Sequence, residues 1–196
     1  FANEELGVRN NAFAAAIARA VHAWNPHGLI DNRVHCRYEV TDPTAPDVLL
    51  ELMEAGEMHL LSVMDHSPGQ GQFKEIAAYR DYLARTYKKS DLELDALIES
   101  KRAQAQGAMD RIRRLIDAAK AKGIPVASHD DDTPEKVETL HGLGVGISEF
   151  PINLETARAA RERGMTTVFG APNILRGKSQ SGAIRALDAV LAGVAD

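Results

Sequence analysis

The sequence predicts an α/β fold in which parallel strands alternate with helices. Three glycines, Gly123, Gly144 and Gly164, recur about 20 residues apart, and each precedes a short apolar run, a polar cluster and a helical pattern. Glycine suits the left-handed position that follows the end of a helix. The runs are apolar throughout rather than alternating, which is typical of parallel strands that are covered on both faces.

Two earlier segments repeat this alternation of helix and strand. We expect strands within residues 32–40 and 58–66, which follow helices at about 3–24 and 44–55. Together with the three units that the glycines introduce, the prediction is about five parallel strands.

Residues 67–122 break this rhythm and are predicted to be a helical insertion. A Gly-rich turn is followed by a helix near 74–87 and then by one long polar helix, for which Ser90 is the expected N-cap. Acidic residues in its first turn and lysines in its last turn agree with the helix dipole. We expect its basic residues to form a solvated face; a surface for a partner or a phosphate is the alternative.

Composition limits the possible functions. The chain has 196 residues, of which 44% are hydrophobic, so it can bury the core of one globular domain. A formal net charge of -5 excludes a general attraction to nucleic acid or to anionic membranes. Cys36 is the single cysteine, and no apolar run approaches the roughly 20 residues of a membrane span. These features favour a small-molecule site in a protein of the reducing cytoplasm.

Polar residues stand where the predicted strands end, and this is where α/β proteins concentrate their chemistry. They are Glu39, Asp65, His66, His129, Asp130, Glu149 and Asn173. Imidazole and carboxylate groups are the usual ligands of zinc, manganese and iron. Ligands from different parallel strands can converge without close sequence spacing, so the pattern indicates a divalent metal site.

The segment VASHDDDTPE, residues 126–135, places one imidazole and three carboxylates at such a strand end. Asp132 or Thr133 is expected to cap the helix that Pro134 begins. His129 is a candidate for a metal ligand or an acid or base, since the following acids can orient its ring. A histidine that caps a helix or is satisfied in the core is the alternative.

Two further segments could hold an anion. The turn SPGQGQF, residues 67–73, has the glycines that let backbone N–H groups approach a phosphate, but it lacks the lysine of a P-loop, and a tight turn is the alternative. Arg176 and Lys178 stand among small residues near an expected helix start, where a phosphoryl group could bind. His35 lies inside a strand pattern and is expected to serve packing.

Four motifs in order carry a resemblance to a known family: SVMDHSPGQGQF, VASHDDDTPEKV, ISEFPINLETARAARERGM and VFGAPNILRGKSQSG. They resemble the PhnM family of phosphonate metabolism, within the amidohydrolase superfamily of metal-dependent (β/α)8 barrels. The resemblance implies hydrolysis of α-D-ribose 1-methylphosphonate 5-triphosphate to the 5-phosphate, with release of diphosphate. A water molecule acidified by one or two divalent cations would attack phosphorus.

By this resemblance the chain covers strands 3 to 7 of such a barrel and is expected to be a piece of a longer protein. The family's H-x-H-like motif of strand 1 and catalytic aspartate of strand 8 are missing. The implied metal ligands are His129 and His66, with the family's carboxylate on Glu39 or Glu149. From their place at a strand end, His129 and Asp130 are also the candidates for catalysis. The residues implied to neutralise the substrate's phosphates are Arg37, Arg176 and Lys178.

Residues 1–196 are therefore expected to form a single, incomplete barrel of the TIM type. A complete barrel needs about 250 residues and eight strands. Open sheet edges would lead to homo-oligomers or aggregation, and the chain alone would have little or no hydrolase activity. The alternatives are a non-catalytic half-barrel that binds sugar phosphates or another protein, and a metal-independent isomerase-like or aldolase-like barrel.

Overall fold

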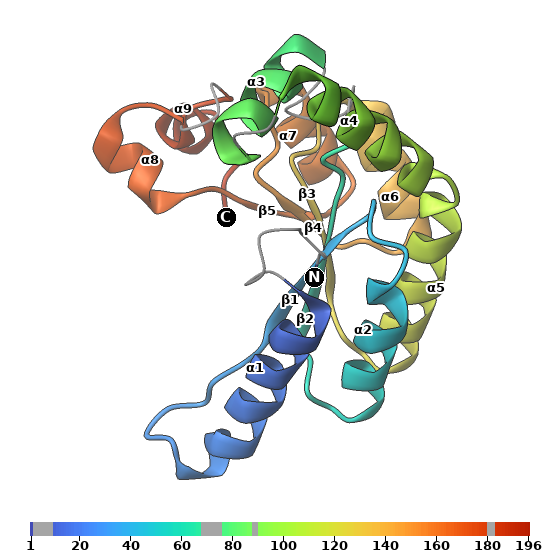
Figure 1. The fold of residues 1–196 in the computed structure, drawn as a ribbon. Helices are drawn as coiled ribbons and strands as arrows, with labels where there is room; N and C mark the ends of the chain where they lie inside the picture. The colour runs from blue at the N-terminus through green and yellow to red at the C-terminus, as the bar shows by residue number, and fades with distance from the viewer. Residues whose placement is uncertain (2–9, 68–75, 88–89, 180–182) are drawn as a thin grey trace. The chain divides into compact units, whose positions relative to one another are not determined.

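A computed structural model describes residues 1, 10–67, 76–87, 90–179 and 183–196. The chain divides into two compact units, Phe1–Ile124 and Pro125–Asp196. Figure 1 shows the helices and strands of both. The expected single domain with a helical insertion remains a prediction.

The five predicted strands are all present within the described residues, and the prediction of an α/β fold is confirmed. They are β1 (His35–Glu39), β2 (Leu60–Met64), β3 (Val126–His129), β4 (Ile147–Glu149) and β5 (Thr166–Val168). In the first unit β1 pairs in parallel with β2, and in the second unit β4 pairs in parallel with both β3 and β5. Within each unit, the polar strand ends therefore lie at the same edge.

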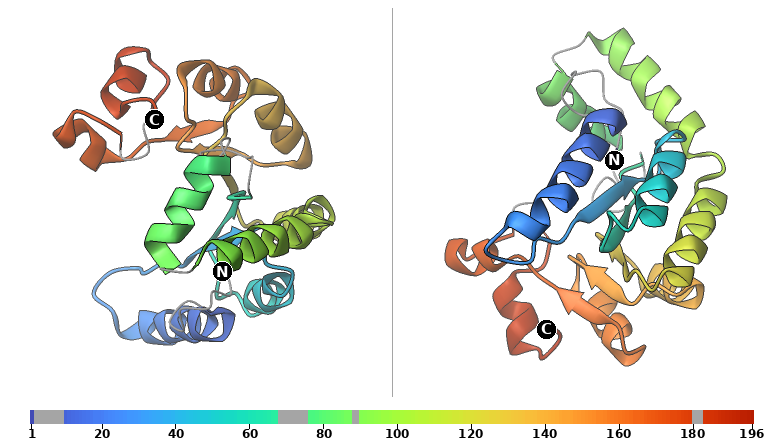
Figure 2. Two further views of the ribbon diagram at one scale, coloured as in Figure 1. Left: turned by 45° about the horizontal axis from the view of Figure 1, so that its top comes forward. Right: turned by 90° about the horizontal axis from the view of Figure 1, so that it is seen from below.

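Helices connect these strands and cover them. In the first unit they are α1 (Asn11–Trp24), the short 3-10 helix η1 (Asn25–His27), α2 (Ala45–Glu54), α3 (Ile76–Tyr87), α4 (Asp91–Ala105) and α5 (Ala108–Ala121). In the second unit they are α6 (Pro134–Leu143), α7 (Leu154–Glu162), α8 (Ala171–Arg176) and α9 (Ala186–Leu191). Helix α2 packs against both α1 and α5, and α6 packs against α7 (Figure 2).

One long helix from Ser90 to about residue 122 was the wrong prediction, because the segment forms two helices. Gly107 adopts a left-handed backbone with φ 70°, which separates α4 from α5 and which a residue without Cβ adopts at little cost. Ser90 does begin α4 as predicted: its backbone N–H and its hydroxyl both donate to the Glu93 carboxylate, at 2.9 and 2.6 Å.

Arg111 ties this break to the end of β1. Its guanidinium donates to the carbonyls of Gln104 and Gln106, at 2.7 and 2.8 Å, and to the carbonyl of Val40 at 2.7 Å. It also donates to the hydroxyl of the fully buried Tyr38 at 3.0 Å. The side chain thus joins the α4–α5 junction to the chain on either side of Glu39.

The cores and helix ends follow the sequence pattern. In the first unit, Leu49 and Leu52 of α2 and Leu115 and Ile116 of α5 are fully buried. The three glycines that recur in the sequence all adopt left-handed backbones at helix ends, with φ between 69° and 108°. Thr133 caps α6 by accepting from the backbone of Lys136 at 3.2 Å, as one of the two predicted alternatives.

His35 does not serve packing, as had been expected, because its side chain is exposed and its Nε2 contacts the hydroxyl of Ser62. The next residue, Cys36, is buried and unpaired with another cysteine. Among the residues that the structure describes, no helix combines the length and the apolar character that crossing a bilayer requires.

Candidate metal-binding residues at the strand ends

In the first unit, Glu39 and His66 form a close pair. Glu39 is the last residue of β1, and His66 follows β2 by two residues. Oε2 of Glu39 lies 2.7 Å from Nδ1 of His66, and Oε1 accepts from the backbone N–H of His66 at 3.2 Å. The carboxylate therefore fixes the orientation of the ring, and a ligand role of His66 would fall to Nε2. Asp65 accepts from the backbone of Ser67 at 3.0 Å and so shapes the turn.

In the second unit, His129 and Glu149 are partners in the register of β3 and β4 and are the last residues of both strands. Nε2 of His129 lies 4.0 Å from Oε2 of Glu149, and Nδ1 lies 3.2 Å from Oδ2 of Asp130. The ring also packs edge-on against Phe150, with the ring centroids 5.3 Å apart. The three donors are largely buried, so imidazole and carboxylates share a site that is screened from water.

The backbone at these two strand ends has an unusual conformation. Asp130 and Phe150 have φ of 52° and 59°, and among the described residues they are the non-glycine residues with positive φ. Asp130 donates its N–H to the Glu149 carbonyl at 3.0 Å, and Phe150 donates to the Val168 carbonyl at 2.8 Å. Such strain persists only where surrounding contacts enforce it, and it gathers at functional sites.

Within each unit, predicted ligands lie together at the strand ends. His66 with Glu39 belongs to the first unit, and His129 with Glu149 and Asp130 belongs to the second. A common site for both histidines remains a prediction. Residues 68–73 of the Gly-rich turn lie outside the described residues.

The predicted phosphate-binding residues are exposed. Arg37 is an exposed residue of β1 in the first unit. Arg176 is the last residue of α8 and Lys178 follows its left-handed C-cap, Gly177. The expectation of a helix start at this point was therefore wrong: the helix ends here, and Asn173 lies within it. Phosphate binding by these side chains remains a prediction.

Sequence reasoning missed three buried polar residues beneath the second pair. Asp131, Ser128 and Ser148 have no exposed surface, and both hydroxyls donate to the Asp131 carboxylate. The row of three aspartates, residues 130–132, drew attention to the segment, but it could not distinguish the buried member from its neighbours.

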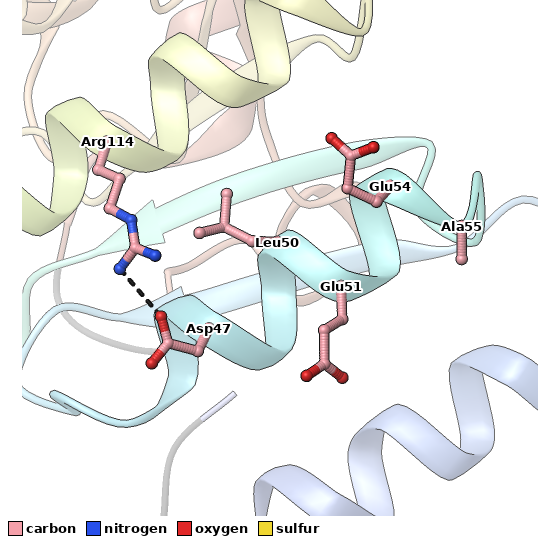
Figure 3. Close-up of a pocket in the computed structure, with 6 residues that line it drawn as sticks. All are labelled: Asp47, Leu50, Glu51, Glu54, Ala55 and Arg114. Atoms are coloured by element: carbon pink, nitrogen blue, oxygen red, sulfur yellow. Dashed lines mark ion pairs between the residues drawn. The ribbon is translucent and has the colours of Figure 1, made fainter.

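A surface groove in the first unit is lined by none of the candidate site residues. It runs between α2 and α5 and is lined by Asp47, Leu50, Glu51, Glu54, Ala55 and Arg114 (Figure 3). Its charged groups are already paired, since Arg114 contacts Asp47 at 2.9 Å and Lys122 contacts Glu54 at 2.7 Å. The groove therefore adds no candidate site.

Parallel strands joined by helices, with polar side chains at the strand ends, are features that TIM-type barrel enzymes share. The chain is 38% identical over 167 residues, 85% of its length, to alpha-D-ribose 1-methylphosphonate 5-triphosphate diphosphatase of Escherichia coli strain K12. The resemblance to the PhnM family is thereby confirmed. The chain spans 44% of the length of this relative. No family model matches the chain.

Proposed function

We propose that this chain supplies metal-binding and substrate-binding residues of a hydrolase that cleaves α-D-ribose 1-methylphosphonate 5-triphosphate to the 5-phosphate and diphosphate. The observation that carries this proposal is the 38% identity to the Escherichia coli diphosphatase over 85% of the chain. The histidine–carboxylate pairs at the strand ends support it independently, because they offer the donor types that a hydrolytic metal needs.

The donor set fits a divalent cation. Glu39 occupies both of its oxygens with His66, so we assign Glu39 to orienting the ring and His66 to binding metal. In the second unit His129 and Glu149 are spaced as neighbours on one sheet edge, and Asp130 lies on the other ring nitrogen. Zinc, manganese and iron all accept nitrogen and oxygen donors of this kind. A cation bound there would lower the pKa of a water molecule and neutralise phosphate charge.

The remaining roles fall to the exposed cations. Arg176 ends α8, Lys178 lies two residues further on, and Arg37 lies on β1. A guanidinium can bind two phosphate oxygens at once, and hydrolysis of a triphosphate depends on neutralising its negative charge. We assign these residues to binding the triphosphate. Asp130 and His129, at the end of β3, are assigned to proton transfer.

The chain alone is proposed to have little or no turnover and to associate with itself through exposed strand edges in the cytoplasm. Calorimetric titration with Mn²⁺ or Zn²⁺, followed by the ribose triphosphate, tests the proposal. We expect metal to bind and the triphosphate to bind more tightly once metal is present. Binding of sugar phosphate that is indifferent to metal would favour the non-catalytic half-barrel. Absence of both metal and triphosphate binding would overturn the proposed function.

A further inference from the structure

A buried carboxylate joins two strands directly beneath the candidate ligands of the second unit. Oδ2 of Asp131 accepts from the hydroxyls of Ser128 and Ser148, both at 2.5 Å. These two serines are register partners on β3 and β4. A single carboxylate oxygen therefore fixes the distance between the two strands at this register position.

His129 and Glu149 follow these serines immediately and are partners at the next register position. Because successive side chains of a strand point to opposite faces, the serines and Asp131 lie on one face of the sheet and the candidate ligands on the other. Movement of β3 against β4 would change both pairs together. The spacing of the His129 imidazole from the Glu149 carboxylate is thus coupled to the hydrogen bonds of Asp131.

The loops after the two strands are tied through the same segment. The Asp131 carbonyl accepts from the backbone N–H of Ile152 at 2.9 Å, and the Asp132 carbonyl accepts from the side chain of Asn153 at 3.1 Å. We call the Asp131 carboxylate and the two serine hydroxyls that donate to it the Asp131 clamp. Asp130, whose backbone is left-handed with φ 52°, lies between His129 and Asp131. The strained backbone of Asp130 therefore lies where the chain passes from the candidate ligand His129 to the buried carboxylate of Asp131.

Stability alone does not explain why a carboxylate is buried at this position. Asp131 has no exposed surface, and its nearest cation, Nζ of Lys136, is 3.8 Å from Oδ1. Burial of a charge in such a setting is often no more stabilising than apolar packing of the same volume. Hydrogen bonds outside the ligand set commonly orient metal ligands. Here they act on β3 and β4, the strands that carry His129 and Glu149.

We infer that Asp131 is a positioning residue, which holds His129 and Glu149 at the spacing needed for a shared cation by clamping Ser128 and Ser148. This inference rests on the proposed function for the metal, but the clamp itself can be observed without metal. The clear observable is the contact between the His129 and Phe150 rings, whose centroids are 5.3 Å apart.

The experiment compares the 196-residue wild-type chain with Ser148→Ala, the double variant Ser128→Ala with Ser148→Ala, and Asp131→Asn. Thr167→Val is the matched control, because Thr167 is the register partner of Ser148 on β5 and donates its hydroxyl to the Val194 carbonyl rather than to Asp131. The ring contact is followed by nuclear Overhauser effects in the apo chain, and Mn²⁺ affinity by competition with a chelator.

We expect the ring contact to weaken in Ser148→Ala and further in the double variant, to be partly kept in Asp131→Asn, and to be unchanged in Thr167→Val. Mn²⁺ affinity is expected to fall about 10-fold to 100-fold in the double variant and less than about 2-fold in the control. An unchanged ring contact in the single and double variants would overturn the inference. Wild-type chain that binds no Mn²⁺, yet loses the ring contact in the variants, would keep the clamp and contradict the proposed function. If the double variant fails to fold, Ser148→Ala alone decides the question.

Discussion

His129 and Glu149 stand at the same register position at the ends of β3 and β4, with Nε2 and Oε2 4.0 Å apart. This spacing is longer than a hydrogen bond and leaves room for a cation that both groups could bind. The pair Glu39 and His66 is arranged differently, since Nδ1 and Oε2 are in direct contact at 2.7 Å. We therefore propose different roles for the two carboxylates: Glu149 as a metal ligand and Glu39 as the group that orients the His66 ring.

The role of Glu39 in orienting the His66 ring can be distinguished from a general effect of losing one negative charge. Glu39→Gln keeps the shape of the side chain but weakens its hold on the His66 ring, so divalent metal affinity is expected to fall about 10-fold to 100-fold. Chelator competition measures the affinity. The matched control is Glu54→Gln, which removes a surface carboxylate paired with Lys122 and should leave metal affinity unchanged. Equal affinities of the two variants would contradict the role.

Arg176 tests the phosphate half of the proposal. Arg176→Ala is expected to weaken binding of the ribose triphosphate by roughly 10-fold, because a bidentate guanidinium–phosphate contact is lost. Calorimetry of the metal-loaded chain measures the affinity. Arg158→Ala is the control, since Arg158 is an exposed residue of α7. Unchanged binding after the loss of Arg176 would remove this residue from the substrate site.

Two glycines near the end of α6 offer an internal comparison of backbone strain. Gly144 has φ 108°, so Gly144→Ala should lower the free energy of unfolding by roughly 1–2 kcal/mol. Gly142 lies within the helix with open space around an added Cβ, so Gly142→Ala should raise it by about 0.5–1 kcal/mol. Urea denaturation measures both, and effects of the same sign would contradict this description of the helix end.

Arg111 should contribute strongly to the stability of the first unit. Arg111→Ala leaves the buried Val40 carbonyl and the Tyr38 hydroxyl without their guanidinium partner, and a loss of about 2–4 kcal/mol in the free energy of unfolding is expected. Arg113→Ala, on the exposed side of the same helix, should change it by less than about 0.5 kcal/mol. Urea denaturation of both variants measures the difference, and equal losses of stability would contradict a structural role of Arg111.

Cys36 gives the stability a dependence on pH. Burial raises the pKa of its thiol from 9.0 to about 11. Between these values the unfolded chain has lost the proton and the folded chain keeps it, so stability falls as pH rises, by roughly 1.4 kcal/mol for each pH unit. Below pH 9 this contribution is constant. Denaturation from pH 8 to pH 11 should show a shallower decline in Cys36→Ala, and parallel declines would contradict the assignment.

Much of the fold could be predicted because its signals are local. The apolar runs identified all five strands, and glycine at three helix ends marked the turns between them. The break at Gly107 was missed because the polar pattern continues through it. The bond of Arg111 to the distant Val40 carbonyl, which helps to hold the junction in place, cannot be read from the sequence. The strand-end donors could likewise be predicted. The Asp131 clamp could not, since its hydroxyl partners lie 3 and 17 residues away along the chain.

The most direct test is the metal content of the purified 196-residue chain, measured by elemental analysis with His129→Ala beside it. We predict close to one divalent cation per chain in the wild type and a large loss in the variant, because His129 lies between Asp130 and Glu149 as the central donor. Equal metal content in the two proteins, or its absence from both, would contradict the claim that these strand ends bind metal.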